Sequence, residues 1–140
     1  MVLEREAYEA IVSHAARAYP DECCGAIVGV LEGDRRLVHG AWPIANAATS
    51  PGHRFVVTAG DYRQLEDRAR ESGVALVGFY HSHPDAPAAP SGYDLAHAWP
   101  HFSYVIVSVE ATVPVAMTCW RLRDDRSGFD SEDITWQPAS

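Results

Sequence analysis

The stretch Val74-Ala75-Leu76-Val77-Gly78-Phe79-Tyr80-His81-Ser82-His83-Pro84 decides the fold. Its first seven residues form an almost unbroken apolar run, which is typical of a central strand that is buried on both faces. Residues two apart in a strand point to the same face, so His81 and His83 can aim their ring nitrogens at one point. The sequence therefore predicts a buried strand that ends in a pair of imidazoles.

A third candidate ligand, Asp94, lies eleven residues after His83, which is far enough for the chain to turn back. Two histidines and one carboxylate leave one position of a tetrahedral zinc ion open for water, which is the arrangement of a catalytic site. The alternative is that His81 and His83 are two exposed polar residues of a strand. The complete spacing favours a divalent-metal site.

Hydrolysis of an amide at such a site also needs a proton carrier. A metal ion lowers the pKa of a bound water to about 7, and a carboxylate usually takes the proton and passes it to the leaving amine. Glu22, in Pro20-Asp21-Glu22-Cys23-Cys24-Gly25, precedes an apolar strand, where a charged side chain needs a partner. Glu22 is the best candidate for this role; the alternative, a solvated loop acid, is the default for a single glutamate.

Ser91 lies three residues before Asp94. Its hydroxyl could donate a hydrogen bond to the oxyanion that forms when water attacks a carbonyl. The pattern Ser-x-x-Asp at the start of a helix also resembles a capping box. The two interpretations are compatible, with Ser91 near the cap and Asp94 facing the metal.

The remaining pattern indicates an α+β, α/β-like fold in one domain over residues 1–140. Helical periodicity and stop signals predict two long helices and a short one, and apolar runs between turns predict a mixed sheet of about six to seven strands. The expected helices cover 3–18, 61–72 and 91–98, and the expected strands cover 24–31, 36–42, 53–57, 74–80, 104–109, 115–122 and 134–137.

Composition excludes several classes of protein. The net charge is -8, and all 11 basic residues are Arg, which opposes nonspecific binding to nucleic acid. No stretch reaches the roughly 18 apolar residues of a membrane span, and no secretory signal is evident, so we expect a cytoplasmic protein without a membrane partner. The three cysteines, two of them adjacent, do not form a disulfide framework or a Cys-rich zinc site.

Two segments together resemble the JAMM (MPN-type, Mov34/PAD-1-like) zinc metalloproteases. Pro20-x-Glu22-x-Cys24-Gly25 resembles their first box. Gly78-Phe79-Tyr80-His81-Ser82-His83-Pro84, followed by Ser91-x-x-Asp94 at the H-x-H-x₇-S-x-x-D spacing, resembles the second. The resemblance implies an MPN/cytidine-deaminase-like sandwich.

The same resemblance implies a zinc ion bound by His81, His83 and Asp94, with Glu22 as general acid and base and Ser91 at the oxyanion. It also implies hydrolysis of a peptide or isopeptide bond after the C-terminal glycine of a ubiquitin-like protein. The short chain is similar to the bacterial branch, whose substrates are ubiquitin-like sulfur carriers with a Gly-Gly tail, in some cases with release of cysteine. Members of this fold often pair, so a homodimer is compatible with the resemblance.

Two other functions remain to be compared with this one. An inactive MPN-type scaffold would only assemble partners, and such domains usually lack one or more ligands, whereas this sequence lacks none. A zinc nucleobase deaminase would need a P-C-x-x-C pair, which is absent from the sequence. His39, His53, His97 and His101 have no partner pattern and are not assigned to the metal, and His14 is expected to be a packed or half-exposed histidine of its helix face.

Overall fold

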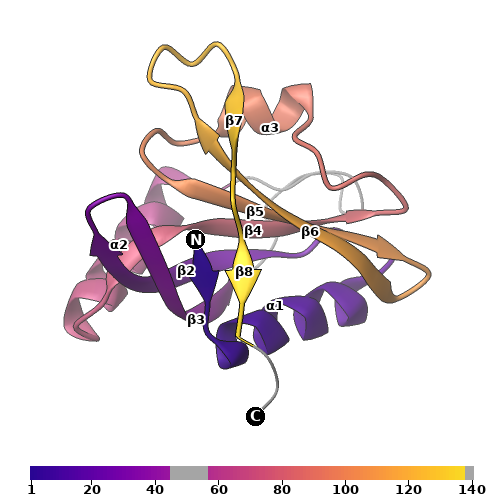
Figure 1. Ribbon diagram of the computed structural model, residues 1–140, viewed down its shortest axis with the longest axis horizontal. Helices are drawn as coiled ribbons and strands as arrows, with labels where there is room; N and C mark the ends of the chain where they lie inside the picture. Colours follow the sequence, from indigo (N-terminus) through magenta and orange to yellow (C-terminus); the bar gives the residue numbers. More distant parts are fainter. Residues whose placement is uncertain (45–56, 138–140) are drawn as a thin grey trace.

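The computed structural model describes residues 1–44 and 57–137, which form a mixed eight-stranded sheet with helices on both faces (Figure 1). The strand order is β7-β6-β5-β4-β2-β3-β1-β8. The strands are β1 (Val2–Leu3), β2 (Cys24–Glu32), β3 (Arg35–Ile44), β4 (Ala75–Pro84), β5 (Ser103–Glu110), β6 (Val113–Leu122), β7 (Phe129–Glu132) and β8 (Thr135–Trp136). The helices are α1 (Arg5–Ala18), α2 (Ala59–Glu71) and α3 (Gly92–His97).

Strand β4 lies in the middle of the sheet, between antiparallel β2 and parallel β5. The pairing with β5 is close at Gly78, because a Cβ atom there would lie 1.8 Å from the carbonyl oxygen of Ser103. Pairing with β5 continues through His83 to Pro84, so both histidines belong to the strand. The apolar run therefore delivers the two imidazoles on a rigid element.

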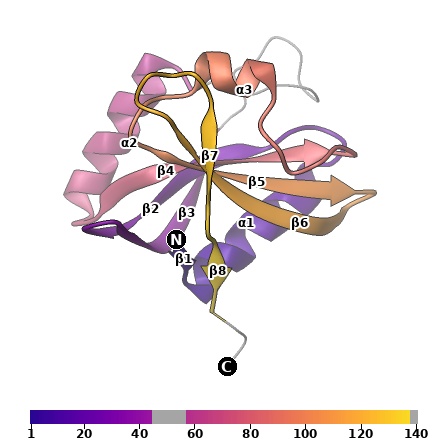
Figure 2. The same ribbon diagram turned by 45° about the horizontal axis from the view of Figure 1, so that its top comes forward.

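Helix α1 covers one face of the sheet and α2 the other, with α3 beside the end of β4 (Figure 2). Ala7, Ile11 and Ala15 of α1 recur every four residues and are buried, which is the spacing of a single helix face. They pack in one core cluster with Tyr80 of β4. Phe79, the preceding residue, belongs to the second core cluster, on the α2 face.

Helix α2 has clear start and stop signals. Thr58 and Asp61 form a capping box, in which each side chain accepts a hydrogen bond from the backbone N–H of the other residue. Leu65 and Ala69 are the buried residues of this helix. The helix stops before Gly73, whose φ of 72° lies in the left-handed region that favours glycine.

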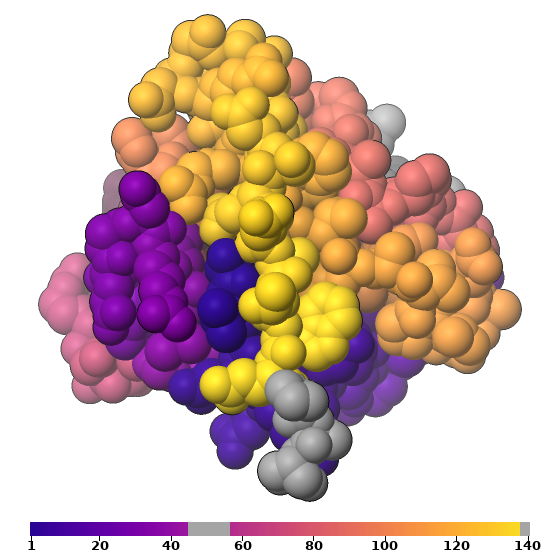
Figure 3. All heavy atoms as spheres, in the orientation of Figure 1, coloured from indigo at the N-terminus to yellow at the C-terminus, as the bar shows by residue number. Residues whose placement is uncertain are grey.

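The two edges of the sheet come together at the C-terminal part of the described chain. Strand β7 pairs with β6, β8 pairs with β1, and residues 133–134 alone separate β7 from β8. The sheet is therefore curled, and Figure 3 shows the yellow C-terminal strand lying beside the indigo N-terminal residues. Backbone hydrogen bonds from Thr135 to Met1 and from Gln137 to Leu3 join them.

The expected α+β fold class is confirmed. The described residues contain eight strands rather than six to seven, because two short strands, β1 and β7, were not expected. The helix expected over 3–18 begins only at Arg5, since Leu3 pairs with Val38 in the sheet. The strand expected over 53–57 lies outside the described residues, apart from Val57. None of the helices in the described ranges is long and apolar enough to cross a membrane.

Candidate active site and metal centre

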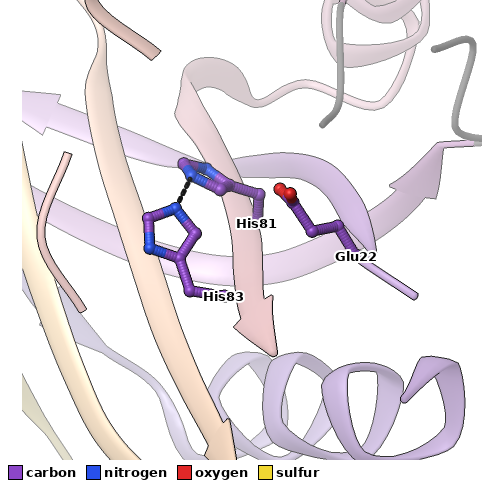
Figure 4. Close-up of side chains that lie close together, drawn as sticks. All are labelled: Glu22, His81 and His83. Atoms are coloured by element: carbon purple, nitrogen blue, oxygen red, sulfur yellow. Dashed lines mark hydrogen bonds between the residues drawn. The ribbon is translucent and has the colours of Figure 1, made fainter. Parts of the chain in front are cut away.

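The imidazoles of His81 and His83 face each other at the end of β4. Their Nε2 atoms are 3.0 Å apart (Figure 4). His81 is 1% exposed, and His83 lines a cleft. Two ring nitrogens at this distance need a proton or a cation between them, because two lone pairs would repel.

Asp94 reaches the same point from the first turn of α3. Its Oδ2 atom lies 3.3 Å from the Nε2 atoms of both His81 and His83. A capping box fixes this position: Ser91 N–H donates to Asp94 Oδ2 at 2.8 Å, and Asp94 N–H donates to Ser91 Oγ at 3.0 Å. The capping interpretation of Ser91-x-x-Asp94 is therefore confirmed, and the same cap turns the carboxylate toward the histidines.

The spacing of these three ligand atoms fits a tetrahedral metal ion. At zinc–ligand distances of about 2.0–2.1 Å, the ligand atoms of a tetrahedral zinc ion lie about 3.3–3.4 Å apart. The triangle formed by His81, His83 and Asp94 has edges of 3.0, 3.3 and 3.3 Å. The residues present therefore fit such an ion without rearrangement of the backbone.

The surroundings of the three groups shift their pKa values in different directions. Burial lowers the pKa of His81, with partial compensation by Asp94, so this imidazole is neutral at neutral pH. Burial alone would raise the pKa of Asp94, but hydrogen bonds with both histidines hold it well below its usual range. Burial alone would lower the pKa of His83, but hydrogen bonds with Asp94 and with the Pro87 carbonyl raise it. His83 Nδ1 lies 2.8 Å from the carbonyl oxygen of Pro87. Because a carbonyl only accepts, Nδ1 carries the hydrogen there, and Nε2 is left to bind a metal.

Glu22 approaches the same centre from the segment that precedes β2. One carboxylate oxygen of Glu22 and one ring nitrogen each of His81 and His83 lie within 4.8 Å of one another, and Glu22 is 8% exposed. In Figure 4 its carboxylate points toward the two imidazoles. The sequence separates Glu22 from His81 by 59 residues, and the antiparallel pairing of β2 with β4 brings them together.

Ser82, between the two histidines, anchors the segment that carries Glu22. Its Oγ accepts a hydrogen bond from the N–H of Cys23 at 2.8 Å, and its own N–H donates to the Cys23 carbonyl at 3.1 Å. These bonds fix the residue next to Glu22 to the strand that carries both histidines. No sequence pattern predicts this positioning role, because one serine in a strand has no distinctive signature.

Gly25 of the first box lies beneath a tyrosine ring. A Cβ atom at Gly25 would lie 2.2 Å from a ring carbon of Tyr80, so any side chain would displace that ring. The hydroxyl of Tyr80 lies 2.7 Å from His14 Nδ1 on α1. Gly25 therefore allows β2 to pass close to β4 beside the histidines.

A cleft of about 350 Å³ opens onto this centre. Glu22, His83, Ser91 and Asp94 contribute its polar groups. Its other lining residues are small and apolar, namely Pro84, Ala86, Pro87 and Ala89. The cleft therefore brings together His83 and Asp94 with Glu22 and Ser91, whereas His81 stays buried behind them.

A family model described as prokaryotic homologs of the JAB domain matches residues 4–123. The chain belongs to this family. Desampylase of Haloferax volcanii is 33% identical over 111 residues, which are 76% of this chain and 78% of that protein. CysO-cysteine peptidase of Mycobacterium tuberculosis is 33% identical over 109 residues, which are 77% of this chain and 73% of that protein.

Solved structures show the same fold as this JAB domain chain. A protein of Desulfitobacterium hafniense, 32% identical, superposes with a TM-score of 0.84 over 99% of this chain and 94% of that one. A JAB1/MPN domain protein of Archaeoglobus fulgidus, 17% identical, has a TM-score of 0.62 over 97% of this chain and 98% of that one. The JAB/MPN fold expected from the two boxes is therefore confirmed.

Other side chains of this JAB domain chain that could react or bind a metal are buried or have hydrogen-bond partners elsewhere. Cys24 is fully buried, and burial raises its pKa to about 12, so it is a packed residue rather than a nucleophile. His39 Nδ1 contacts Glu4, and His97 Nδ1 contacts the carbonyl of Tyr93. His53 lies outside the described residues.

Proposed function

We propose that this chain, a peptidase of the prokaryotic JAB domain family, cleaves a peptide or isopeptide bond after the C-terminal glycine of a ubiquitin-like sulfur-carrier protein. The names of its relatives, desampylase and CysO-cysteine peptidase, support such a substrate. The observation that carries the proposal is the convergence of His81, His83 and Asp94 beside Glu22 at the cleft. Release of cysteine from a carrier is one form of this reaction.

We propose zinc as the metal and His81, His83 and Asp94 as its ligands. Two neutral imidazole nitrogens and one carboxylate oxygen are a common ligand set of catalytic zinc. A zinc ion in this position supplies Lewis acidity, which activates water near neutral pH and polarises a substrate carbonyl. Asp94 orients both imidazoles through contacts with its Oδ2 atom, and a hydrogen bond from the Ser91 N–H holds Asp94 in place.

Glu22 and Ser91 perform the remaining steps. The Glu22 carboxylate accepts a proton from the attacking water and transfers it to the leaving nitrogen, a role that typically contributes about 10²–10⁴-fold in rate. Ser91 Oγ accepts the Asp94 N–H, and its own hydrogen can be donated to the substrate carbonyl oxygen as negative charge develops. Both side chains line the cleft.

The test uses carrier proteins that end in Gly-Gly and bear one of three extensions: a single cysteine, a short peptide, or a lysine side chain in isopeptide linkage. The zinc-loaded chain should cut after the last glycine of at least one of them, as located by mass spectrometry. Chelation should stop the cut, and added zinc should restore it. A Glu22→Gln chain serves as the matched control, because it retains all three proposed ligands.

Two results would reject the proposal. Cleavage that is unaffected by chelation or by Glu22→Gln would assign the chemistry to other groups. Binding of the carriers without any cleavage, in a chain shown to contain zinc, would favour the inactive scaffold.

A further inference from the structure

Four successive residues of the segment after β4, Asp85 to Ala88, are each held by a side chain from a different part of the fold. Alanine and proline side chains anchor a surface segment poorly, so three of these contacts are made to backbone carbonyls. The four contacts are Tyr19 Oη to Asp85 Oδ2 (2.5 Å), Ser108 Oγ to Ala86 O (2.5 Å), His83 Nδ1 to Pro87 O (2.8 Å) and Thr118 Oγ1 to Ala88 O (2.5 Å).

The register of the sheet explains why Ser108 and Thr118 can reach this segment. Ser108 of β5 is the pairing partner of His83. Thr118 of β6 pairs with Ile106, which in turn pairs with His81. Partners in register point to the same face of a sheet, so both hydroxyls lie on the face that carries the histidines. The segment folds back over that face.

A neighbouring indole fixes the direction of the Thr118 hydroxyl. Trp120 Nε1 lies 2.8 Å from Thr118 Oγ1, and an indole nitrogen can only donate. Thr118 Oγ1 therefore accepts from Trp120 and directs its own hydrogen to the Ala88 carbonyl. The three groups form a chain of hydrogen bonds from β6 to the cleft wall.

We propose that Ser108 and Thr118 are positioning residues of the active site. Their hydroxyls hold the carbonyls on either side of Pro87, whose own carbonyl orients His83. Ala86 and Pro87 also line the cleft. The two hydroxyls thus set both the orientation of one proposed metal ligand and the wall along which a substrate tail lies; the second effect rests on the proposed function.

The test compares Thr118→Val, Ser108→Ala and the double variant with wild type. Valine matches the shape of threonine and removes only the hydroxyl. Thr118→Ser keeps the donor and should behave as wild type. Trp120→Phe removes the indole donor but leaves the bond to Ala88, and Thr135→Val removes an exposed hydroxyl of the edge strand β8. Melting temperatures and circular dichroism verify folding.

Three measurements are made on each folded variant. Hydrogen–deuterium exchange at the amides of Ala86, Ala88 and Ala89 reports on the segment. Competition with a chromophoric chelator gives the zinc affinity. Steady-state cleavage of a Gly-Gly-Cys carrier gives kcat and KM.

We expect Thr118→Val to accelerate exchange of the segment, to weaken zinc binding and to raise KM, each by roughly three- to tenfold, as loss of one hydrogen bond implies. The value of kcat should stay within about twofold, because neither hydroxyl touches the reacting atoms. The double variant should exceed either single variant. Faster exchange without any change in zinc affinity or KM would overturn the proposal, as would unchanged exchange in both single variants.

The same experiment separates the two proposals. If wild type cleaves no carrier, the proposed function fails, whereas exchange and zinc affinity still decide whether the hydroxyls position His83. If wild type cleaves the carrier and the variants match it in all three measurements, only the positioning role is rejected.

Discussion

Neighbouring residues of β4 have opposite surroundings. His81 and His83 point to the α2 face, where their nitrogens converge with a carboxylate on one point. Tyr80 and Ser82 point to the other face, as alternation along a strand requires. Each of these has a definite partner within the chain, namely His14 for Tyr80 and Cys23 for Ser82.

The difference between the two faces of β4 separates a candidate metal site from residues that only stabilise the fold. A buried polar group with one partner in the same chain is a structural feature, because its hydrogen bond offsets the cost of burial. Three ligand atoms with mutual distances of 3.0–3.3 Å instead leave room for a cation at their centre. Substitutions on the two faces should therefore affect different properties, activity on one face and stability on the other.

The largest effect is expected from His83→Ala. It removes one proposed ligand, so zinc affinity should fall by more than about 100-fold, since loss of a mere supporting partner typically costs about 10–100-fold. Carrier cleavage should fall with it. His97→Ala, on α3 next to the site, is the control and should retain both properties. Equal zinc content in the two variants would refute the ligand assignment.

Glu22→Gln should leave the metal in place and remove the proton carrier. We expect kcat to fall by about 10²–10⁴-fold, with zinc affinity close to that of wild type. Steady-state kinetics on a Gly-Gly carrier and zinc titration make the comparison. A variant that keeps its kcat would exclude Glu22 from proton transfer.

Ser91→Ala should affect both catalysis and stability. Loss of an oxyanion donor lowers kcat by about 10²–10³-fold, and loss of the cap destabilises by about 1 kcal/mol. Thr58→Ala, which removes the equivalent cap of α2, should reproduce only the stability loss. If both variants leave kcat unchanged, Ser91 acts as a cap alone.

Ser82→Ala tests the face of β4 opposite the histidines, at the residue that holds Cys23 beside Glu22. It leaves the buried N–H of Cys23 without its acceptor, which should destabilise the chain by about 1–3 kcal/mol in urea unfolding. We expect a loss in kcat smaller than that of Glu22→Gln, because Glu22 is displaced rather than removed. A kcat loss as large as that of Glu22→Gln would place Ser82 in the chemistry itself.

The smallest effect is expected from Tyr80→Phe. It removes the hydrogen bond to His14 and keeps the ring over Gly25, so the free energy of unfolding should fall by about 1 kcal/mol. Carrier cleavage should remain at the wild-type rate when measured well below the melting temperature. A marked loss of activity would show that the face of β4 with Tyr80 also affects catalysis, which would contradict the proposed difference between the two faces.

The histidine pair and Asp94 could be predicted from sequence because their signals are local. The apolar run predicts a strand, alternation puts His81 and His83 on one face, and Ser91-x-x-Asp94 predicts a helix start. The place of Glu22 before an apolar strand made it a candidate, but only the resemblance to the first box favoured it over a loop acid, since its approach depends on the pairing of β2 with β4. The expected roles of Glu22 and Ser91 in catalysis stay predictions.

The structure adds features for which the sequence has no signal. Ser82, Ser108 and Thr118 are single hydroxyl residues in strands, and their partners are backbone groups far away in the chain. Backbone acceptors have no sequence identity, so no pattern marks them. The charged strand β7 was missed for a related reason, because Phe-Asp-Ser-Glu lacks the apolar alternation of a half-buried strand.

The short link between β7 and β8 has a consequence for how the protein opens. A sheet usually unravels from an edge strand, whose outer backbone groups have no neighbour. Here the two outermost strands are consecutive in the chain and only two residues apart, so detachment of one pulls on the other. Detachment of β7 and detachment of β8 should therefore be cooperative. The amides of the two strands should lose their protection from hydrogen exchange together.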